Sequence, residues 1–396
     1  MGALCANPAS ATALYDEILS SDPALSSFTQ SSGSSLVPDF QAQDGLFARA
    51  FAILEDAVGH QAFPCASIAV THGEKLIALK AFGRFTYGDS PRAAPGTVFD
   101  VASVTKAVAT TTMAAIEYDR GLLAFETPLI EVVPEFFTTD SRRSEVTLRM
   151  LLAHSSGLPA YEKLFLRART RDQLLAEAFS VPLKYGPGSH SEYSDIGFIL
   201  LGLGLERIAQ EPLDRFCQRE IFGPLGMAST TFTPPQSWRS KIPPTSDDRT
   251  FRGRIIQGEV QDENASVMEG VAGHAGLFST AADLATFAHA MLSRGKAILG
   301  RHTLATFTQR QGEPAGTARA LGWDTPSAPS QSGRYFSSSA FGHLGYTGTS
   351  LWIDPERQIS ITLLTNRTWP DCTNQAIKQV RPRFHDAVIE SLETSH

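Results

Sequence analysis

The sequence predicts an α+β fold in which an antiparallel sheet is flanked by helices and interrupted by an inserted all-helical domain. Two observations carry this prediction. Runs typical of strands occur near both ends of the 396-residue chain, at 65–83 and 341–365, whereas the long middle is mostly helical in pattern. Helical apolar spacing also precedes the first strands and follows the last. The most economical arrangement joins all these strands in one sheet and covers one face with the first and last helices.

The first half of the chain begins with a helix and a hairpin. Apolar residues recur at helical spacing from Gly45 to Val58. Two apolar runs then flank the segment 72–75, in which a glycine permits a tight turn, so a hairpin is expected. A further helix is predicted from Ser103 to Arg120, with Gly121 ending it.

The second half starts helical and returns to strands. Helices are predicted at 146–152 and 196–209, and Thr280 opens a T-x-x-D start signal for another. Three strands follow in FGHLGYTG, SLWID and QISITLLTN, and the segment 354–357 forms the turn between the last two. A closing helix is expected over 371–392.

These elements predict three parts of the chain. Residues 1–40 are rich in Ser, Ala and Pro and are expected to form an N-terminal extension. Residues 41–110 and 318–396 form the sheet domain, and residues 111–317 form the mostly helical domain. Ser103 then falls at the seam between the two domains, where sites often lie.

Composition narrows the function classes. Apolar residues make up 42% and charged residues 19% of the chain, as in an ordinary globular enzyme, and the net charge is −7. Long Lys/Arg runs and bilayer-length apolar stretches are absent from the sequence, so we expect neither a nucleic-acid partner nor a transmembrane segment. The four cysteines are widely spaced and the histidines form no H-E-x-x-H, so we expect no metal and no cofactor. The cysteines are Cys5, Cys65, Cys217 and Cys372.

The N-terminus gives an expectation about the compartment. It lacks a basic start followed by a long apolar run, so the chain as given is expected to be cytoplasmic. A periplasmic or secreted location follows if a signal was removed. The sequence leaves the oligomeric state open.

A candidate nucleophile stands at the start of the predicted helix. Ser103 and Lys106 form an S-x-x-K, which places the two side chains side by side on one helix face. An amine beside a hydroxyl can take its proton. The alternative is a helix N-cap serine without chemistry. A second S-x-x-K, Ser293 to Lys296, closes a predicted helix and is interpreted as a C-terminal cap.

Two further motifs follow in the chain. Tyr193 and Asp195 form a Y-x-D between a Gly/Pro-rich loop and an apolar helix, where the alternative role of Asp195 is a helix cap. His343 and Gly345 form an H-x-G on a predicted strand, and glycine inside a strand often marks close approach of a ligand. The amide of Tyr346 would share an oxyanion hole with that of Ser103. The alternative role of His343 is a half-buried, hydrogen-bonded histidine.

The order S-x-x-K, Y-x-D, H-x-G resembles the penicillin-recognising serine hydrolases. This family includes class C β-lactamases, DD-peptidases, D-aminopeptidases and family VIII carboxylesterases. The likeness covers residues 41–395 and extends through FDVASVTK, LLAHSSGLPAY, YSDIGFILLG, VAGHAGLFSTAADLATF and FGHLGYTGTSLWIDPE. It implies a serine β-lactamase-like (DD-peptidase) fold.

The resemblance also implies a role for each motif residue. Ser103 would be the acylated nucleophile, Lys106 its activating neighbour and Tyr193 the base. The amides of Ser103 and Tyr346 would form the oxyanion hole, and His343 occupies the Lys/His position of the third motif. The segments around two other histidines, at 154 and 274, resemble structural parts of the family.

The chain departs from the family at two motifs. Asp195 replaces an asparagine that donates a hydrogen bond to substrate, which an ionised carboxylate cannot do. We hypothesise that Asp195 pairs with Lys106, making that lysine a poorer base and moving the activity optimum to alkaline pH. His343 and Leu344 replace the Lys and Thr of K-T-G, which help to hold a substrate carboxylate. Strong carboxylate binding is therefore not expected.

The sequence thus predicts a serine hydrolase that acts on ester or amide bonds of a small molecule, of the carboxylesterase type. A β-lactamase, a D-Ala-D-Ala carboxypeptidase or a D-aminopeptidase is the alternative within enzymes. A penicillin-binding sensor that is acylated without turnover is the alternative outside them. A Ser-His-Asp α/β-hydrolase is disfavoured because the sequence contains no G-x-S-x-G.

Overall fold

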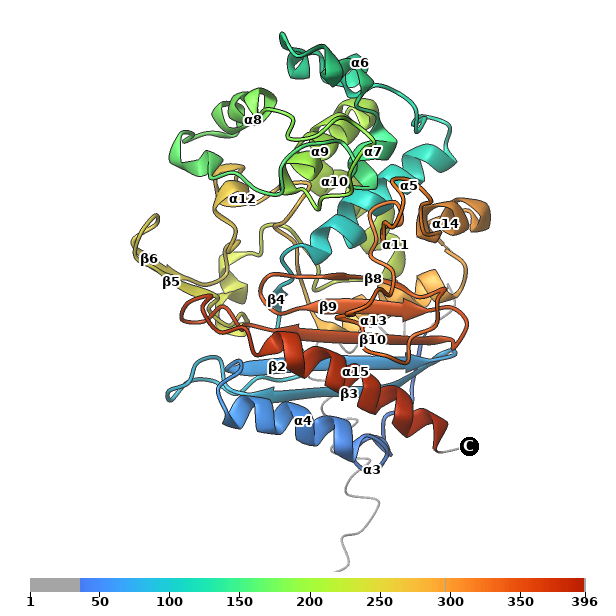
Figure 1. The fold of residues 1–396 in the computed structure, drawn as a ribbon. Coiled ribbons are helices and arrows are strands. Elements are labelled where there is room, and N and C mark those ends of the chain that lie inside the picture. The colour runs from blue at the N-terminus through green and yellow to red at the C-terminus, as the bar shows by residue number, and fades with distance from the viewer. Residues whose placement is uncertain (1–35, 296, 395–396) are drawn as a thin grey trace, which may run out of the picture.

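The computed structural model describes residues 36–295 and 297–394, and a six-stranded sheet forms the base of this part of the chain. The strand order is β1-β3-β2-β10-β9-β8. Figure 1 shows the run from β3 through β2, β10 and β9 to β8. Neighbouring strands are antiparallel except β1, which runs parallel to β3. The strands are β1 (Val37–Pro38), β2 (Cys65–His72), β3 (Lys75–Gly83), β8 (Phe341–Leu344), β9 (Ser350–Asp354) and β10 (Ile359–Thr365).

The centre of the sheet joins the two ends of the chain. Strand β2 pairs with β10 from Ala66 opposite Thr365 to His72 opposite Ile359. All the residues of β10 are buried, because helices cover both faces of the sheet. This arrangement confirms the predicted α+β fold with early and late strands in one antiparallel sheet.

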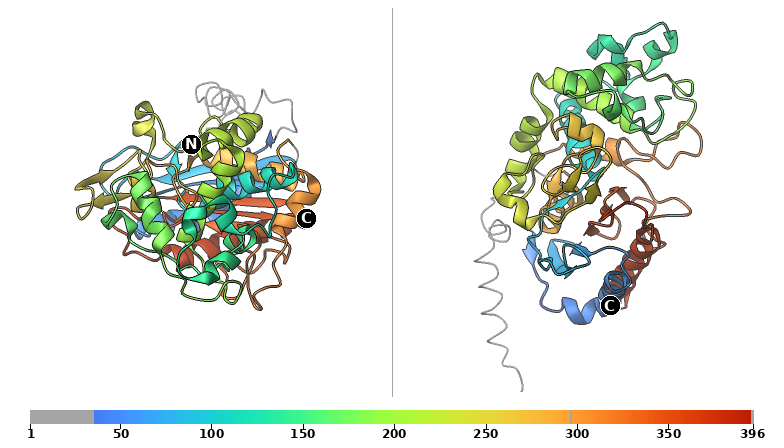
Figure 2. Two further views of the ribbon diagram at one scale, coloured as in Figure 1. Left: turned by 90° about the horizontal axis from the view of Figure 1, so that it is seen from above. Right: turned by 90° about the vertical axis from the view of Figure 1, so that its left-hand side faces the viewer.

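Alternate residues of these strands enter two different cores. Ile68 and Trp352 pack with α4 (Ala48–Gly59) and α15 (Ile377–Glu393) on one face. Their chain neighbours point to the opposite face, where α13 (Ala281–Leu292) lies. The right-hand view of Figure 2 shows α4 and α15 together at the end of the molecule remote from the helical part. The first and last long helices therefore share a face, as predicted.

Apart from α3, which packs beside α4 and β3, the remaining helices gather beyond one edge of the sheet, where Figure 1 shows α6 to α10 above β8. Helix α9 is the buried axis of this part, because residues 196–205 are all buried. The bounds are α3 (Gln43–Leu46), α5 (Thr112–Asp119), α6 (Leu129–Val132), α7 (Leu148–Leu152), α8 (Arg171–Ser180), α9 (Asp195–Ala209), α10 (Leu213–Cys217), α11 (Gly223–Leu225), α12 (Glu263–Val267) and α14 (Arg301–Thr308).

Shorter elements complete the described chain. Two π-helical segments are η2 (Lys106–Thr111) and η6 (Gln218–Phe222), and 3-10 turns are η3 (Pro134–Phe136), η4 (Ser141–Glu145), η5 (Leu164–Leu166) and η7 (Gln236–Lys241). Two small sheets pair β4 (Phe99–Asp100) with β7 (Phe278–Ser279) and β5 (Ser246–Asp248) with β6 (Arg254–Ile256). Over residues 36–295 and 297–394, no helix combines the length and apolarity that crossing a membrane requires.

The expected local signals are present. Thr280 caps α13, since its hydroxyl accepts a hydrogen bond from the amide of Asp283 at 3.1 Å. The helix predicted after Ser103 also forms, with η2 as its first part and Gly121 at φ +71° beyond its end.

The domain boundaries remain a prediction, to which the structure adds two placements. Val37 and Pro38, within the predicted extension 1–40, pair with β3 at the sheet edge. Helix α13, within the predicted helical range 111–317, packs on the sheet. Residues 1–35, the greater part of that extension, lie outside the described residues.

Candidate active site

Ser103 stands on a tight turn between β4 and the helix that contains η2. Ala102, just before it, has φ +48°, a left-handed conformation that residues other than glycine rarely adopt. The buried Asp100 carboxylate stabilises the turn by accepting hydrogen bonds from the amides of Ala102 at 2.8 Å and Gln261 at 2.7 Å. Burial raises the pKa of Asp100 to about 6, although both amides oppose the shift. Ser103 therefore projects from a turn whose backbone is fixed by the hydrogen bonds of Asp100.

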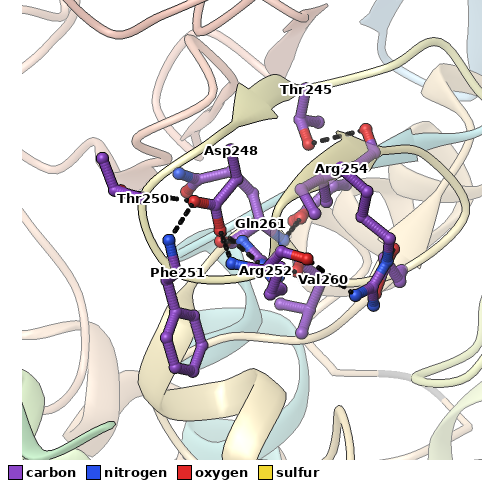
Figure 3. A network of polar contacts seen from close by, with 11 residues as sticks. Thr245, Asp248, Thr250, Phe251, Arg252, Arg254, Val260 and Gln261 are labelled. Carbon is purple, nitrogen blue, oxygen red and sulfur yellow. Dashed lines mark hydrogen bonds and ion pairs between the residues drawn. The ribbon is translucent and has the colours of Figure 1, made fainter. Parts of the chain in front are cut away.

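The Gln261 side of this turn depends on a buried ion pair in the β5–β6 hairpin. Arg252 lies 2.8 Å from Asp248 and donates hydrogen bonds to the carbonyls of Val260 at 2.7 Å and Gln261 at 2.6 Å (Figure 3). These contacts fix the segment whose amide reaches Asp100. The hairpin therefore supports the turn that carries Ser103 through the backbone of Gln261.

Lys106 is fully buried and has three oxygen neighbours. Its Nζ lies 2.9 Å from Ser103 Oγ, 2.8 Å from the carbonyl oxygen of His274 and 2.6 Å from Asp195 Oδ1. Burial lowers the pKa of Lys106, whereas the Asp195 carboxylate acts in the opposite direction. The pairing of Asp195 with Lys106 that the sequence led us to hypothesise is present in the structure.

Tyr193 lies beside both Ser103 and Lys106 and is enclosed by rings and cations. Its ring centroid lies 4.7 Å from that of His154, 4.8 Å from Lys106 Nζ and 5.4 Å from the guanidinium carbon of Arg319. Burial and the Asp195 carboxylate raise the pKa of Tyr193 well above its usual value, and hydrogen bonding to Ser103 and the charge of Arg319 oppose the rise. The side chains of Ser103, Lys106, Asp195 and Tyr193 therefore form one closed polar network, called the Ser–Lys–Asp–Tyr network below.

His343 is buried beside this network as a neutral imidazole. Its Nδ1 donates a hydrogen bond to the carbonyl oxygen of Leu344 at 2.8 Å, and its ring centroid lies 6.1 Å from that of Tyr193. Burial, followed by the charge of Lys106, lowers the pKa of His343 to about 3. The third motif therefore presents no positive charge at neutral pH.

Gly345 stands where the β8–β9 turn meets the turn that carries Ser103. A Cβ on Gly345 would lie 2.0 Å from Thr349 Oγ1 and 2.5 Å from the carbonyl oxygen of Val101, so only glycine fits. Thr349 also donates a hydrogen bond to that carbonyl at 2.9 Å, and Thr347 donates one to the carbonyl of Asp100 at 2.8 Å. The glycine of the H-x-G motif thus permits the contact between these two turns.

Tyr346 has a half-exposed side chain and an anchored backbone. The guanidinium carbon of Arg367 lies 4.4 Å from the Tyr346 ring centroid, and Arg367 Nε donates to the Tyr346 carbonyl at 2.7 Å. The structure thus brings all seven residues selected from the sequence into one region. The seven are Ser103, Lys106, Tyr193, Asp195, His343, Gly345 and Tyr346.

Sequence reasoning missed three groups beside the network. The carbonyl of His274 holds Lys106, His154 accepts the amide hydrogen bond of Ser194 at Nδ1 over 3.0 Å, and Arg319 covers the Tyr193 ring. The family-like segments LLAHSSGLPAY and VAGHAGLF point to the two histidines, but only as structural parts. No local pattern distinguishes Arg319.

Comparisons with known proteins agree with this fold. The sequence profile of the Beta-lactamase family matches residues 50–380. The putative D-alanyl-D-alanine carboxypeptidase of Escherichia coli (strain K12) is 30% identical over 77% of this chain and 79% of that protein. The N-acetylmuramyl-L-alanine amidase of Bacillus subtilis (strain 168) is 31% identical over 77% of each chain.

Solved structures show the same fold. EstCE1, a hydrolase with promiscuous acyltransferase activity, is similar with a TM-score of 0.72 and 21% identity over 88% of this chain and 99% of that one. A class C β-lactamase from Rhodobacter sphaeroides is similar with a TM-score of 0.68 and 20% identity, over 87% of this chain and 99% of that one. The fold is therefore that of the serine β-lactamases and penicillin-binding proteins, as the sequence predicted. The chain belongs to the β-lactamase family and is a serine hydrolase.

Proposed function

We propose that this hydrolase cleaves carboxylic esters of small molecules through an acyl-enzyme on Ser103. The observation that carries the proposal is the Ser–Lys–Asp–Tyr network, in which Lys106 Nζ lies 2.9 Å from Ser103 Oγ. An oxygen nucleophile needs a nearby group to accept its proton, and this amine is within hydrogen-bond reach.

Lys106 accepts the proton of Ser103 in the proposed acylation step. At rest the amine donates to Ser103 Oγ and to the carbonyl of His274 and lies 2.6 Å from Asp195 Oδ1. In its neutral, reactive form the amine turns its lone pair toward Ser103 and keeps the other two contacts. Ser103 Oγ then bonds to the ester carbonyl carbon as its proton moves to Lys106. The lowered pKa of Lys106 supports this assignment, because it increases the fraction of neutral amine.

Tyr193 relays that proton to the leaving group. The raised pKa of Tyr193 keeps it a phenol at neutral pH, so our proposal gives it this role rather than the initial base role expected from the resemblance. The bond to the leaving alkoxide breaks, Tyr193 protonates the alkoxide, and Lys106 returns a proton to Tyr193. In deacylation a water molecule attacks the acyl carbon, its proton passes through the same network to Ser103, and the acid is released.

The amides of Ser103 and Tyr346 bind the carbonyl oxygen as it becomes negative. Support comes from the hydrogen bonds of Thr347 and Thr349 to the carbonyls of Asp100 and Val101, which join the two turns that carry these amides. Preorganised amides of this kind stabilise an oxyanion without reorganisation during the reaction.

The choice of ester over a carboxylate-bearing substrate rests on the charges around the site. His343 is neutral and Leu344 replaces the threonine of K-T-G. Arg367 donates to the carbonyls of Tyr346, Cys372 and Asn374, so its cation is already engaged. Arg319 is paired with an acid.

A D-Ala-D-Ala carboxypeptidase or amidase is the second candidate. The names of the E. coli and B. subtilis relatives favour it, at 30% and 31% identity. These substrates carry a carboxylate or a peptide amide in place of the ester. A β-lactamase and a penicillin-binding sensor without turnover use the same nucleophile and are separated by the same experiment.

The test compares p-nitrophenyl butyrate, nitrocefin and a D-Ala-D-Ala peptide as substrates. Ester turnover that Ser103→Ala abolishes, with slow cleavage of the other two, is the expected result. Ser293→Ala is the matched control, because it changes the serine of the second S-x-x-K and should retain activity. Preferred nitrocefin or peptide cleavage would replace the esterase proposal. Stoichiometric labelling by a fluorescent β-lactam without turnover would indicate a sensor, and activity in Ser103→Ala would refute the assigned nucleophile.

A further inference from the structure

Arg319 covers the ring of Tyr193 from a loop outside the three motifs. Its guanidinium carbon lies 5.4 Å from the ring centroid, and its side chain is 23% exposed. It forms an ion pair with Asp324, whose side chain is also largely buried. A guanidinium at this distance from an aromatic face is attracted to the ring, and burial strengthens the attraction.

The loop that carries Arg319 is attached to three parts of the site. The amide of Gly322 donates to the carbonyl of Leu152, at the end of α7, over 2.8 Å. Asp324 exchanges backbone hydrogen bonds of 2.8 and 2.9 Å with Gly342, next to His343 on β8. Thr317 donates to the hydroxyl of Ser191, two residues before Tyr193, over 3.1 Å.

A close backbone approach fixes the loop further. A Cβ on Gly322, which has φ +76°, would lie 1.8 Å from the hydroxyl oxygen of Thr111 on η2. The loop therefore rests on the helix that begins at Lys106. Because these contacts are independent of the Arg319 side chain, the loop determines where the guanidinium lies rather than the reverse.

The charges that face Tyr193 come from several elements. Asp195 on α9 contributes a negative charge that is paired with Lys106 on η2. His154 after α7 and His343 on β8 have lowered pKa values, so both are neutral at neutral pH. Arg319 lies outside the Ser–Lys–Asp–Tyr network and is paired with Asp324, and its positive charge opposes the rise in the pKa of Tyr193 that burial and Asp195 cause.

We propose that Arg319 is a positioning residue that holds the Tyr193 ring beside Ser103 and offsets the negative charge of Asp195. This inference rests on the proposed Ser103 reaction. When Tyr193 gives up its proton to the leaving group, the phenolate forms beneath the guanidinium. The guanidinium favours that charged state and orients the ring for it.

The test is a set of pH–rate profiles for ester hydrolysis, with kcat and KM resolved. Arg319→Met removes the charge but keeps a similar stem, and it is combined with Asp324→Asn so that no unpaired carboxylate remains. The ascending limb reports loss of the proton of Lys106, the base, whose pKa is lowered by burial and, to a smaller extent, by the charge of Arg319. The expected result is therefore an ascending limb moved upward by about one pH unit and a roughly tenfold lower kcat at pH 7, with KM nearly unchanged. Arg319→Lys should keep both the position of the ascending limb and the value of kcat close to those of the wild type.

Charge compensation and a loop control make the test specific. Adding Asp195→Asn to the Arg319→Met and Asp324→Asn variant should return the ascending limb toward its wild-type position. Arg310→Met is the control, because Arg310 supports the same loop by donating to Thr325 at 2.7 Å. The ascending limb of its pH–rate profile should lie at the same pH as that of the wild type.

Three outcomes would overturn the inference. An unchanged limb in the Arg319→Met and Asp324→Asn variant would remove the electrostatic role. A higher KM confined to carboxylate-bearing substrates, with the limb in place, would make Arg319 a substrate-binding residue. An equal shift in Arg310→Met would make the effect one of loop structure. Activity that survives Ser103→Ala would instead refute the proposed function itself, so the two failures are distinguishable.

Discussion

Asp195 Oδ1 lies 2.6 Å from Nζ of the fully buried Lys106, so the residue that departs from the usual Y-x-N motif is ion-paired with the amine of S-x-x-K. The same carboxylate raises the pKa of Tyr193. A single substitution in the second motif thus acts on both groups to which we assign the transfer of the Ser103 proton.

Asp195→Asn should move the ascending limb of the pH–rate profile to lower pH. Without the carboxylate, the pKa of Lys106, already lowered by burial, falls further, and the pKa of Tyr193 falls as well. Both proton carriers then lose a proton more easily, and we expect a shift of about one to two pH units. Measuring kcat/KM from pH 5 to 10 tests this.

The control for this prediction is Glu192→Gln. This variant removes a carboxylate of the same loop, and that carboxylate lies 2.9 Å from Lys184. The ascending limb of its pH–rate profile should match that of the wild type. If the ascending limb of Asp195→Asn lies at the same pH as that of the wild type, the ion pair does not determine the pH dependence of the reaction.

Tyr193→Phe should lower kcat by about 10²- to 10⁴-fold while the melting temperature stays close to that of the wild type. The substitution deletes the hydroxyl that interacts with Ser103 and Asp195, but it keeps the ring that packs 4.7 Å from His154. Ester kinetics and a thermal melt on the same sample separate the two effects. Near-normal kcat would show that Tyr193 only packs.

Gly345→Ala should reduce both activity and stability. The added Cβ would meet Thr349 Oγ1 at 2.0 Å and the Val101 carbonyl at 2.5 Å, so the turn that carries Tyr346 must move away from Ser103. Overpacking of this kind costs about 1–3 kcal/mol of stability, and displacement of one oxyanion donor costs about 10²-fold in kcat.

Gly45→Ala is the matched control for that substitution, because a Cβ there has open space. Denaturant unfolding and ester kinetics on both variants check the prediction. Equal behaviour of the two variants would contradict the close approach at Gly345.

Glu117→Gln should flatten the pH dependence of stability. Glu117 is fully buried on α5, and burial raises its pKa from 4.5 to about 8. The folded state therefore keeps a proton that the unfolded state releases, so this carboxyl lowers the free energy of unfolding as pH rises from about 4.5 to about 8.

Relative to the wild type, Glu117→Gln should gain a few kcal/mol between pH 5 and pH 8. Urea unfolding at both values measures the difference. A constant difference between the two proteins at all pH values would place the pKa of Glu117 in its ordinary range.

The sequence predicted the layout of the sheet and the motif residues of the site. The hairpin around Gly73, the three late strands and the cap at Thr280 follow from local spacing and turn chemistry, which act over a few residues. The association of Asp195 with Lys106 could also be predicted from the sequence, because opposite charges in two motifs of one site are expected to pair.

Other features could not be read from the sequence because they arise between distant segments. The His274 carbonyl that holds Lys106 is a backbone group, which no side-chain pattern reveals. Arg319 reaches Tyr193 only because its loop contacts Leu152 and Gly342, far away in the chain. The packing of α13 on the sheet, rather than among the middle helices, likewise depends on tertiary contacts.

The pairing of β2 with β10 has a consequence for synthesis of the chain. Residues 65–72 leave the ribosome early, yet their partners at 359–365 are made nearly three hundred residues later. Until then β2 has an unpaired edge and an uncovered apolar face, and the turn at 345–349 that borders Ser103 has not yet been made. A nascent or truncated chain is therefore prone to aggregate, and the candidate site is assembled only when the last strands reach the sheet.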